Sequence, residues 1–407
     1  MPSLCFLFLY AVVLGARATP IPVSTLAGGG SLVAEFYLDI QGHRGGRGHT
    51  IENTLPSFAW GLINGVTTLE MDNGITEDGH VVVWHDEYIM GTKCKDTGPL
   101  ALNDSLYPYV GKYIANLTLA QLKTLDCGSE RQVGFEEQII YPGTRMSTLV
   151  EIFDFLECAD PLHKMRLNIE SKINARYPNR TLDVNDFVDK QHAIFISTPY
   201  YHAITFQSLD WRTLIAMRTK DNSIVLSALF SDVTIFGPNR TISPWLAGLN
   251  PDEFPGPTLG EKLAQAASTI PAQIISPSAS TVGSTSTDPT LPGFNEFTTE
   301  EMVMEAHRLG MRVVPWTTNS INLVDRLVHD YNVDGIITDY PYDMIRWAKF
   351  EAKLRVAPRY SSNRVLECLA KHNQVDSMSY LRNRKESNKD ATCDDHRSFH
   401  SCQAPIT

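Results

Sequence analysis

The chain has 407 residues, of which 43% are hydrophobic, enough to bury a sizeable core in one large domain. Its formal net charge of −11 argues against a nucleic-acid binder, because such a protein usually carries a basic face that neutralises phosphates. We therefore expect a globular protein. If it binds an anion, that anion should be small and held by a few local cations.

The N-terminus carries a short apolar run, LCFLFLYAVVLG, followed by Ala16, Arg17 and Ala18. A run of this length before a small-x-small pattern is typical of a cleaved signal peptide, here residues 1–18. Because no basic residue precedes the run, an uncleaved membrane anchor is the alternative, although the run is short for a span. No later segment is apolar enough to cross a bilayer, so we predict a secreted protein.

The cysteines are consistent with secretion. Of the seven, Cys5 lies in the predicted signal peptide, and the others form an even set suited to an oxidising compartment: Cys94, Cys127, Cys158, Cys368, Cys393 and Cys402. Their pairing does not follow from the sequence, although Cys94 with Cys127 and Cys393 with Cys402 are the nearest options. N-x-S/T sequons fit the same route and predict a glycoprotein, with acceptors at Asn103, Asn116, Asn179 and Asn239.

Short apolar runs recur along the chain, several with helix-like segments between them. Runs of this kind, rich in Val, Ile and Leu, are typical of strands buried on both faces: FYLDI, TTLEMD, VVVWHD, RLNIE, AITF, IVLSALF, AQIIS, RVVPW and DGIIT. Intervening segments such as TTEEMVMEAHRLG place apolar residues at helical spacing. The pattern predicts an α/β protein with a parallel sheet.

Nine candidate strands for eight places predict a (β/α)8 TIM barrel over residues 38–350, in which one run is extra. Polar residues that follow these runs support a barrel, whose active site lies at the carboxyl ends of its strands: His43, Asp72, His85, Glu170 and Trp316. An open doubly wound sheet is the alternative, but it gathers ligands at one switch point instead of around a ring.

Two regions do not fit the barrel units. Residues 91–145 contain two cysteines, two sequons and few strand-like runs, so we expect an insertion near the barrel mouth that a Cys94–Cys127 disulfide staples. Residues 357–407 are polar and charged with weak periodicity, which predicts a C-terminal tail that is draped on the surface or partly disordered.

Carboxylates occur at alternate positions on two of the predicted strands. Glu70 and Asp72 share one face, and Glu170 and Lys172 do so at the end of another run. Glu70 and Asp72 alone fit polar strand ends about as well as a cation site, but the third carboxylate favours a metal. Three oxygen ligands suit Mg²⁺ or Ca²⁺ better than zinc, and such an ion favours attack at a phosphoryl group.

Two histidines follow apolar strands close to this acidic cluster. Because imidazole titrates near neutral pH, His43 and His85 are our candidates for general acid and general base. A lone histidine at a strand end is more often only hydrogen-bonded, but two beside an acidic cluster favour catalysis. The remaining candidates lack this context and are interpreted as structural or exposed: His49, His80, His192, His202 and His307.

Five motifs occur together in order between about residues 41 and 341: GHRG with ENT, LEMDNGITEDGHVVVWHD, NIESK, PWTTN and DGIITDYP. This ordered set resembles the glycerophosphodiester phosphodiesterase family, which implies a phosphodiesterase-type (β/α)8 barrel. The stretch TFQSLDW departs from the family's Ser-Phe strand, because Gln207 stands between Phe206 and Ser208.

The resemblance implies a role for each matching residue. His43 and His85 match the acid/base histidines, and the metal ligands match Glu70, Asp72 and Glu170. Arg44 and Lys172 match the cations at the phosphate, and Trp316 matches a tryptophan in the pocket wall. For Glu52 and Asn53, shaping of the first loop is as good an interpretation as substrate contact.

The sequence therefore predicts a secreted, metal-dependent phosphodiesterase that cleaves small glycerophosphodiesters to sn-glycerol 3-phosphate and an alcohol. The nucleophile is water or the glycerol 2-hydroxyl, and the metal is Mg²⁺ or Ca²⁺. A phospholipase D of the sphingomyelinase D type that acts on membrane lipid is one alternative, and a non-catalytic binding protein on the same barrel is another. The sequence leaves the head-group alcohol and the oligomeric state open.

Overall fold

The computed structural model describes residues 37–373 of the chain. The predicted signal peptide, residues 1–18, lies outside the described residues, as do Cys393 and Cys402. The predictions made for these segments therefore stay predictions.

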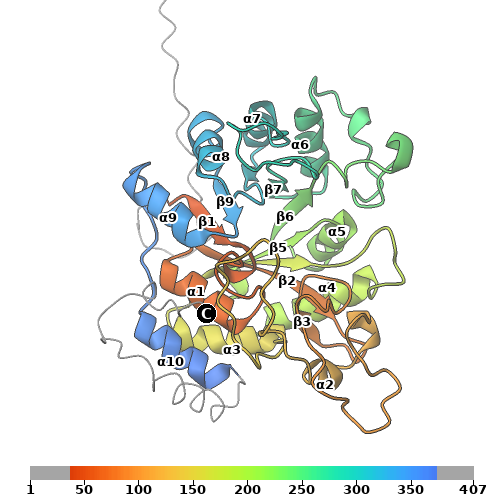
Figure 1. The fold of residues 1–407 in the computed structure, drawn as a ribbon. Coiled ribbons are helices and arrows are strands. Elements are labelled where there is room, and N and C mark those ends of the chain that lie inside the picture. Colours follow the sequence, from red (N-terminus) through yellow and green to blue (C-terminus); the bar gives the residue numbers. More distant parts are fainter. Residues whose placement is uncertain (1–36, 374–407) are drawn as a thin grey trace, which may run out of the picture. The chain divides into compact units, whose positions relative to one another are not determined.

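Eight parallel strands form the centre of the fold, and all of the apolar runs that the sequence analysis singled out form strands (Figure 1). The parallel strands are β1 (Asp39–Gly42), β2 (Thr68–Ile75), β4 (Arg166–Ser171), β5 (Ile204–Ser208), β6 (Val225–Phe230), β7 (Ile274–Pro277), β8 (Arg312–Val313) and β9 (Gly335–Thr338). They pair in the order β8-β7-β6-β5-β4-β2-β1-β9.

The two ends of this sheet meet through backbone hydrogen bonds. Asp334 N–H donates to the Val313 carbonyl at 3.0 Å, Ile337 N–H to Pro315 at 3.0 Å, and Thr318 N–H to Ile337 at 2.9 Å. These bonds join β8 and its continuation to β9 and close the ring. The predicted TIM barrel is thus confirmed, and the open doubly wound sheet is wrong.

The ninth run is the extra one. Strand β3 (Val81–Val83) pairs antiparallel with the outer part of β2, with Asn73 opposite Val83 and Ile75 opposite Val81. The turn between them carries the short sequence TEDGH, which is too short for the crossover that a parallel neighbour needs. His85 therefore follows a hairpin and not a barrel strand, which corrects the placement expected from sequence.

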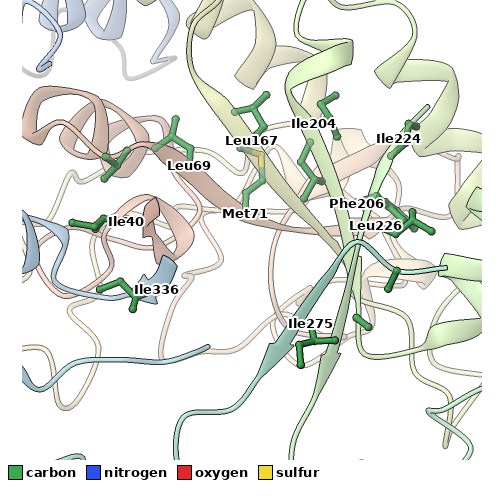
Figure 2. Packing of buried hydrophobic residues seen from close by; sticks show 14 of the residues in the cluster. Ile40, Leu69, Met71, Leu167, Ile204, Phe206, Ile224, Leu226, Ile275 and Ile336 are labelled. Atoms are coloured by element: carbon green, nitrogen blue, oxygen red, sulfur yellow. The ribbon is translucent and has the colours of Figure 1, made fainter. Parts of the chain in front are cut away.

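Alternation along the barrel strands separates apolar from polar side chains. Alternate residues of β1, β2, β4, β5 and β6, among them Ile40, Leu69, Leu167, Phe206 and Leu226, belong to one large cluster that includes helix residues (Figure 2). Their neighbours in the sequence are polar on β1, β2, β4 and β5. On β7 to β9 the alternate positions are apolar again and form a smaller cluster of Ile274, Val314 and Ile337.

The helices begin at the residues that capping predicts. Thr148 and Glu151 form a capping box at α3 (Leu149–Ala159), and Thr258 and Glu261 form one at α6 (Leu259–Thr269). The other helices are α1 (Leu55–Asn64), α2 (Leu119–Leu122), α4 (Val184–Phe195), α5 (Trp211–Lys220), α7 (Glu300–Arg308), α8 (Ile321–Asp325), α9 (Pro341–Phe350) and α10 (Ser362–His372). Within residues 37–373, no helix combines the length and apolarity that a membrane span requires.

The inserted region 91–145 has little regular structure beyond α2 and one 3-10 turn, Ile114–Asn116. A Cys94–Cys127 disulfide confirms the predicted staple. Residues of the insertion and of the β3 hairpin share a hydrophobic cluster separate from the barrel core, which includes Trp84, Tyr109 and Leu122. The region thus has a small core of its own.

The segment that follows the barrel begins with a helix that the sequence analysis did not predict. Helix α10 lies beside α3 (Figure 1), and a Cys158–Cys368 disulfide joins the two across 210 residues of sequence. Val365, Cys368 and Leu369 are its buried residues. Their spacing of three and four gives one apolar face, which an overall polar composition concealed.

Candidate active site

The loop after β1 has an unusual backbone. Arg44 has a φ of 53°, a left-handed conformation that is uncommon for a residue other than glycine. Its N–H donates to Glu70 Oε2 at 2.7 Å, and its carbonyl accepts from Ser57 Oγ at 2.8 Å. Gly45 follows with a φ of 91°, where a Cβ would lie 2.5 Å from Ser57 Oγ. The loop thus needs glycine, as the GHRGG sequence indicated, and is held from two sides.

His43 lies directly opposite Asp339, which the sequence analysis did not single out. Its Nδ1 donates to Asp339 Oδ1 at 2.6 Å, so the Nε2 atom is left for chemistry. Burial lowers the pKa of His43, with Arg44 and Arg47 acting in the same direction against the Asp339 charge. For Asp339, burial alone would raise the pKa, but His43 and Arg47 outweigh it and hold that pKa below its usual value.

Three carboxylates meet where β2 and β4 pair. Oxygens of Glu70, Asp72 and Glu170 lie within 4.8 Å of one another, and the register places Asp72 directly opposite Glu170. Among residues 37–373, Asp72 Oδ1 has no hydrogen-bond partner although it is buried. A buried, unpartnered carboxylate oxygen in an all-oxygen cluster is what a hard divalent cation requires, so these residues fit Mg²⁺ or Ca²⁺.

Electrostatics of the cluster point the same way. Burial and the neighbouring carboxylates raise the pKa of Glu70 well above its usual value and that of Glu170 to about 7. Burial would raise the pKa of Asp72 too, but Arg44, His85 and Lys172 hold it below its ordinary value. Three such carboxylates repel one another at neutral pH unless a cation lies among them.

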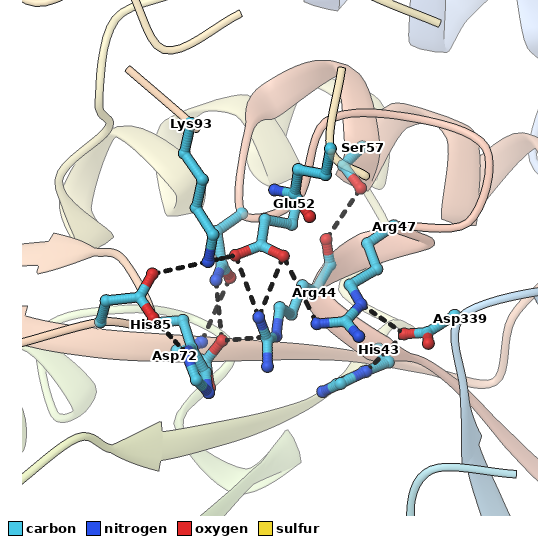
Figure 3. Close-up of polar contacts among 12 residues, drawn as sticks. His43, Arg44, Arg47, Glu52, Ser57, Asp72, His85, Lys93 and Asp339 are labelled. Carbon is cyan, nitrogen blue, oxygen red and sulfur yellow. Dashed lines mark hydrogen bonds and ion pairs between the residues drawn. The ribbon is translucent and has the colours of Figure 1, made fainter. Parts of the chain in front are cut away.

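Arg44 is held by carboxylates on two sides (Figure 3). Its Nη1 donates to both Glu52 oxygens at 3.0 Å, and its Nε lies 3.2 Å from Asp72 Oδ2. Asn53 Nδ2 donates to the same Asp72 oxygen at 2.7 Å. Glu52 and Asn53 thus orient Arg44 and the Asp72 carboxylate, which is the structural role considered for the ENT segment.

Lys172 and Glu170 share a face, as their spacing predicted. Lys172 Nζ donates to Glu170 Oε1 at 2.9 Å and lies 3.9 Å from Asp72 Oδ1. Burial alone would lower the pKa of Lys172, but these two carboxylates raise it, so the ammonium stays charged.

His85 reaches the site from the β3 hairpin. Its Nδ1 donates to Asp86 Oδ1 at 3.1 Å, which again leaves Nε2 available. Burial, followed by the charges of Arg44 and Lys172, holds the pKa of His85 well below its usual value. Asp86 also accepts from Lys93 Nζ at 2.6 Å, and Lys93 donates to Glu52 Oε1 at 2.6 Å.

A chain of hydrogen bonds between polar side chains of the barrel strands ends at Glu70. Gln207 Nε2 donates to Glu70 Oε1 at 3.1 Å, and Gln207 Oε1 accepts from Asn168 Nδ2 at 2.9 Å. Asn168 also donates to Gln41 Oε1 at 2.7 Å. Gln207, the residue at which TFQSLDW departs from the family pattern, therefore contacts a predicted metal ligand.

A cavity of about 200 Å³ opens onto this constellation. Seven of the eight residues that the sequence predicted line it: His43, Arg44, Glu70, His85, Glu170, Lys172 and Trp316. The eighth, Asp72, is fully buried beside them. Apolar side chains complete the wall: Leu209, Leu229 and Ile337.

Sequence reasoning missed the residues that orient the histidines and Arg44. Asp339 follows the last barrel strand within the quoted DGIITDYP motif, so its strand-end position was a usable signal. Gln207 was noticed only as a departure from the family. Lys93 lies in a turn before Cys94, and no spacing rule marks it.

Comparison with known proteins shows the family of this chain. A sequence model of the glycerophosphoryl diester phosphodiesterase family matches residues 43–343. The chain is 31% identical over 130 residues to a glycerophosphodiester phosphodiesterase of Caldanaerobacter subterraneus. These residues are 32% of this chain and 43% of that protein. The chain is 28% identical over 114 residues to human lysophospholipase D GDPD1, which covers 27% of this chain and 35% of that protein. The matched part is thus less than half the length of these curated relatives.

Solved structures share the fold over more of the chain. A Silicibacter pomeroyi protein assigned to the glycerophosphoryl diester phosphodiesterases has a TM-score of 0.59 at 26% identity, covering 76% of this chain and 93% of that one. An Oleispira antarctica phosphodiesterase in complex with the product sn-glycerol-3-phosphate has a TM-score of 0.52 at 18% identity, covering 76% and 95%. The second likeness concerns the fold alone.

Proposed function

The chain belongs to the glycerophosphoryl diester phosphodiesterase family, and on that basis we propose that it hydrolyses glycerophosphodiesters to sn-glycerol 3-phosphate and an alcohol. One observation carries the proposal. Two imidazoles, each with Nδ1 bound to a carboxylate, two cations and an all-carboxylate cluster meet around one cavity of about 200 Å³.

We propose that Glu70, Asp72 and Glu170 hold a divalent ion, Mg²⁺ or Ca²⁺. When bound, such an ion polarises a phosphoryl oxygen as a Lewis acid and helps to orient the nucleophile. Arg44 and Lys172 add two fixed positive charges at the same wall, and their carboxylate partners hold them in place. Charge that grows on the phosphate oxygens as the ester bond breaks is stabilised by these cations.

His43 and His85 move the protons. One imidazole Nε2 takes the proton of the nucleophile as its oxygen forms a bond to phosphorus. The other donates a proton to the alcohol oxygen as the phosphorus–oxygen bond on that side breaks. With water as the nucleophile the products form directly; with the glycerol 2-hydroxyl a cyclic phosphate forms first, and water then opens it.

The size of the cavity favours a small substrate. Its volume of about 200 Å³ lies below the range of about 300 to 1,000 Å³ that is typical of pockets for drug-sized ligands. Its wall of Trp316, Leu209 and Leu229 gives an apolar surface for the carbon atoms of the substrate. The lysophospholipid and sphingolipid alternatives carry an acyl chain as well, and the assay below decides between them and a small substrate.

One assay tests the proposal and its alternatives together. The purified protein is incubated with glycerophosphocholine, lysophosphatidylcholine or sphingomyelin, with EDTA or with added Mg²⁺ or Ca²⁺. We expect turnover of glycerophosphocholine that EDTA abolishes and one of the two metals restores. Turnover of a lipid alone would favour the phospholipase D alternative, and binding without turnover would favour the non-catalytic one.

We also propose that the protein is secreted and glycosylated. Both disulfides within the described residues support folding in an oxidising compartment, and the four sequon asparagines are all exposed: Asn103, Asn116, Asn179 and Asn239. Mass spectrometry of secreted material, with and without endoglycosidase, should find a chain that begins near Thr19 and carries glycan. Retention of Met1 without glycan would contradict this.

A further inference from the structure

Lys93 belongs to the inserted region and forms two ion pairs at the candidate site, one with Glu52 and one with Asp86 (Figure 3). Within the described part of the chain, no other residue of this region pairs with both carboxylates. Its Nζ lies 2.6 Å from Glu52 Oε1 and 2.6 Å from Asp86 Oδ2. Glu52 holds the guanidinium of Arg44, and Asp86 holds the imidazole of His85. One ammonium thus joins the two carboxylates that orient a phosphate-binding cation and a proton carrier.

Burial makes this bridge rigid. The Lys93 side chain is 12% exposed, and its ammonium lies 5.6 Å from the centre of the Trp84 ring. An ion pair that is largely removed from water is screened little by salt, so its geometry is maintained where an exposed pair would fluctuate.

The backbone of Lys93 is fixed by the disulfide next to it. Lys93 N–H and Cys94 N–H both donate to the Met90 carbonyl at 3.0 Å, which makes a tight turn. Cys94 is bonded to Cys127, and beyond it Lys95 and Asp126 exchange two backbone hydrogen bonds of 2.8 and 3.0 Å. The insertion therefore presents Lys93 from the turn directly before a covalently closed loop.

We propose that Lys93 is a positioning residue through which the disulfide-closed insertion sets the placement of His85 relative to Arg44. The inference rests on the proposed phosphodiesterase function. Loss of Lys93 should affect His85 more than Arg44. Without Lys93, Glu52 still pairs with Arg44 and Arg47. Among the ion pairs of the described residues, Asp86 would then keep only the one with His85.

Lys93→Met tests the proposal, because methionine keeps the unbranched apolar stem of the side chain and removes the charged amine at its end. The matched control is Lys95→Met, two residues along, whose ammonium pairs with Glu130 inside the insertion and does not reach the site. We expect Lys93→Met to lower kcat on glycerophosphocholine about tenfold to a hundredfold, as for removal of a group that orients a functional residue, with KM within about threefold. Lys95→Met should match the parent.

A double-mutant cycle with Asp86→Asn shows whether Lys93 acts through Asp86. In the Asp86→Asn background, Lys93→Met should lower kcat by less than about threefold, because the route to His85 is already broken. Lys93→Gln is the second replacement if thermal unfolding shows that Lys93→Met is not folded, and it should give the same pattern.

Titration of His85, followed by NMR on protein with ¹³C-labelled histidine, needs no substrate. The His85 signal is identified by its loss in His85→Gln. Lys93→Met should raise the pKa of His85, because it removes a positive charge and leaves Asp86 and Glu52 less neutralised, whereas Lys95→Met should not. Burial lowers the pKa of His85, the charges of Arg44 and Lys172 act in the same direction, and those of Asp72 and Glu52 oppose them. Asp86 contacts Nδ1 of the same ring.

The two kinds of failure are distinguishable. If the parent turns over no glycerophosphodiester, the proposed function is wrong, and the NMR comparison still decides the role of Lys93. If the parent is active and Lys93→Met equals Lys95→Met in both kcat and the His85 titration, the positioning role is overturned.

Discussion

The barrel and the inserted region 91–145 place functional side chains by different physical means. Barrel strands place Glu70, Asp72 and Glu170 by register, since the ladder between β2 and β4 contains all three and the ladder between β4 and β5 also contains Glu170. The insertion has almost no such ladder. It places Lys93 by one disulfide, one turn and a small separate core.

The contrast predicts how each region responds to change. A register is maintained by many weak bonds, so loss of a barrel side chain removes its chemistry and leaves its neighbours in place. A loop that depends on one covalent bond loses its geometry when that bond is removed. The two histidines come from different regions, because His43 follows the barrel strand β1 and His85 follows the hairpin beside the insertion.

Replacing either histidine should have the largest effect on activity. His43→Ala and His85→Ala should each reduce kcat by about a hundredfold to ten-thousandfold, the range for loss of a general acid or base. Rates against pH should form a bell for the parent, and each variant should lose one limb. A substrate with p-nitrophenol as the alcohol needs no proton on the leaving oxygen, so it should rescue only the variant that lacks the acid. Near-parental kcat in either variant would mean that the pair is wrong.

Loss of a barrel carboxylate should come next. Asp72→Asn should lower activity on the order of a thousandfold, because a metal ion contributes several kcal/mol to the transition state. Isothermal titration calorimetry should show weaker binding of Mg²⁺ or Ca²⁺ with an unchanged thermal unfolding temperature. The control is Asp154→Asn on the exposed face of α3, which should match the parent. Parental metal affinity in Asp72→Asn would make the acidic cluster structural.

The carboxylate behind His43 gives a smaller change. Asp339→Asn replaces the carboxylate that fixes the His43 tautomer with a neutral amide, which can also donate, and should lower kcat about tenfold to a hundredfold. Because Asp339 also raises the basicity of the ring, the limb of the pH profile that belongs to His43 should move to lower pH. An unchanged pH profile in this variant would show that the contact is only structural.

Metal affinity should depend on pH with a definite sign. Burial and neighbouring carboxylates raise the pKa of Glu170 to about 7, and the metal binds only the ionised form. The contribution of Glu170 should therefore weaken metal affinity about tenfold for each pH unit below 7. Above pH 7 this contribution should no longer change with pH. Calorimetry between pH 5.5 and 8 measures this, and Glu170→Gln should flatten the slope. Equal affinity at both ends of the range would contradict the shifted pKa.

The two disulfides provide the mildest and most direct comparison of the regions. Cys94→Ser with Cys127→Ser should lower kcat about tenfold, because Lys93 loses its fixed turn, and should cost about 3 to 4 kcal/mol of stability for a loop of 33 residues. The Cys158–Cys368 disulfide joins α3 to α10 away from the site. Its removal in the double variant Cys158→Ser with Cys368→Ser should destabilise the fold without changing kcat. Equal kcat in both double variants would show that the insertion does not act on the site.

Local spacing was enough for the parts of this protein that depend on backbone geometry alone. Successive side chains of a strand alternate between faces, so Glu70 with Asp72 and Glu170 with Lys172 had to share a face wherever their strands lay. Apolar runs of strand length, with helical periods between them, were enough for the barrel. Together with the ordered motifs, they gave the three carboxylates of the proposed metal site, both candidate histidines and the two cations.

Only the tertiary structure decided which strands became neighbours. Pairing of β1 with β9 puts Gly42 opposite Thr338, so the next residues, His43 and Asp339, meet although 296 positions separate them. Departure of β3 into a hairpin brings His85 to the cavity that His43 and Glu70 line, and brings the neighbouring Asp86 to Lys93. Such contacts depend on register, closure of the ring and one disulfide, which are long-range pairings whose free energy is spread over the whole barrel. The position of Asp339 at a strand end marks it as a candidate without naming its partner, and the sequence around Lys93 carries no signal of its role.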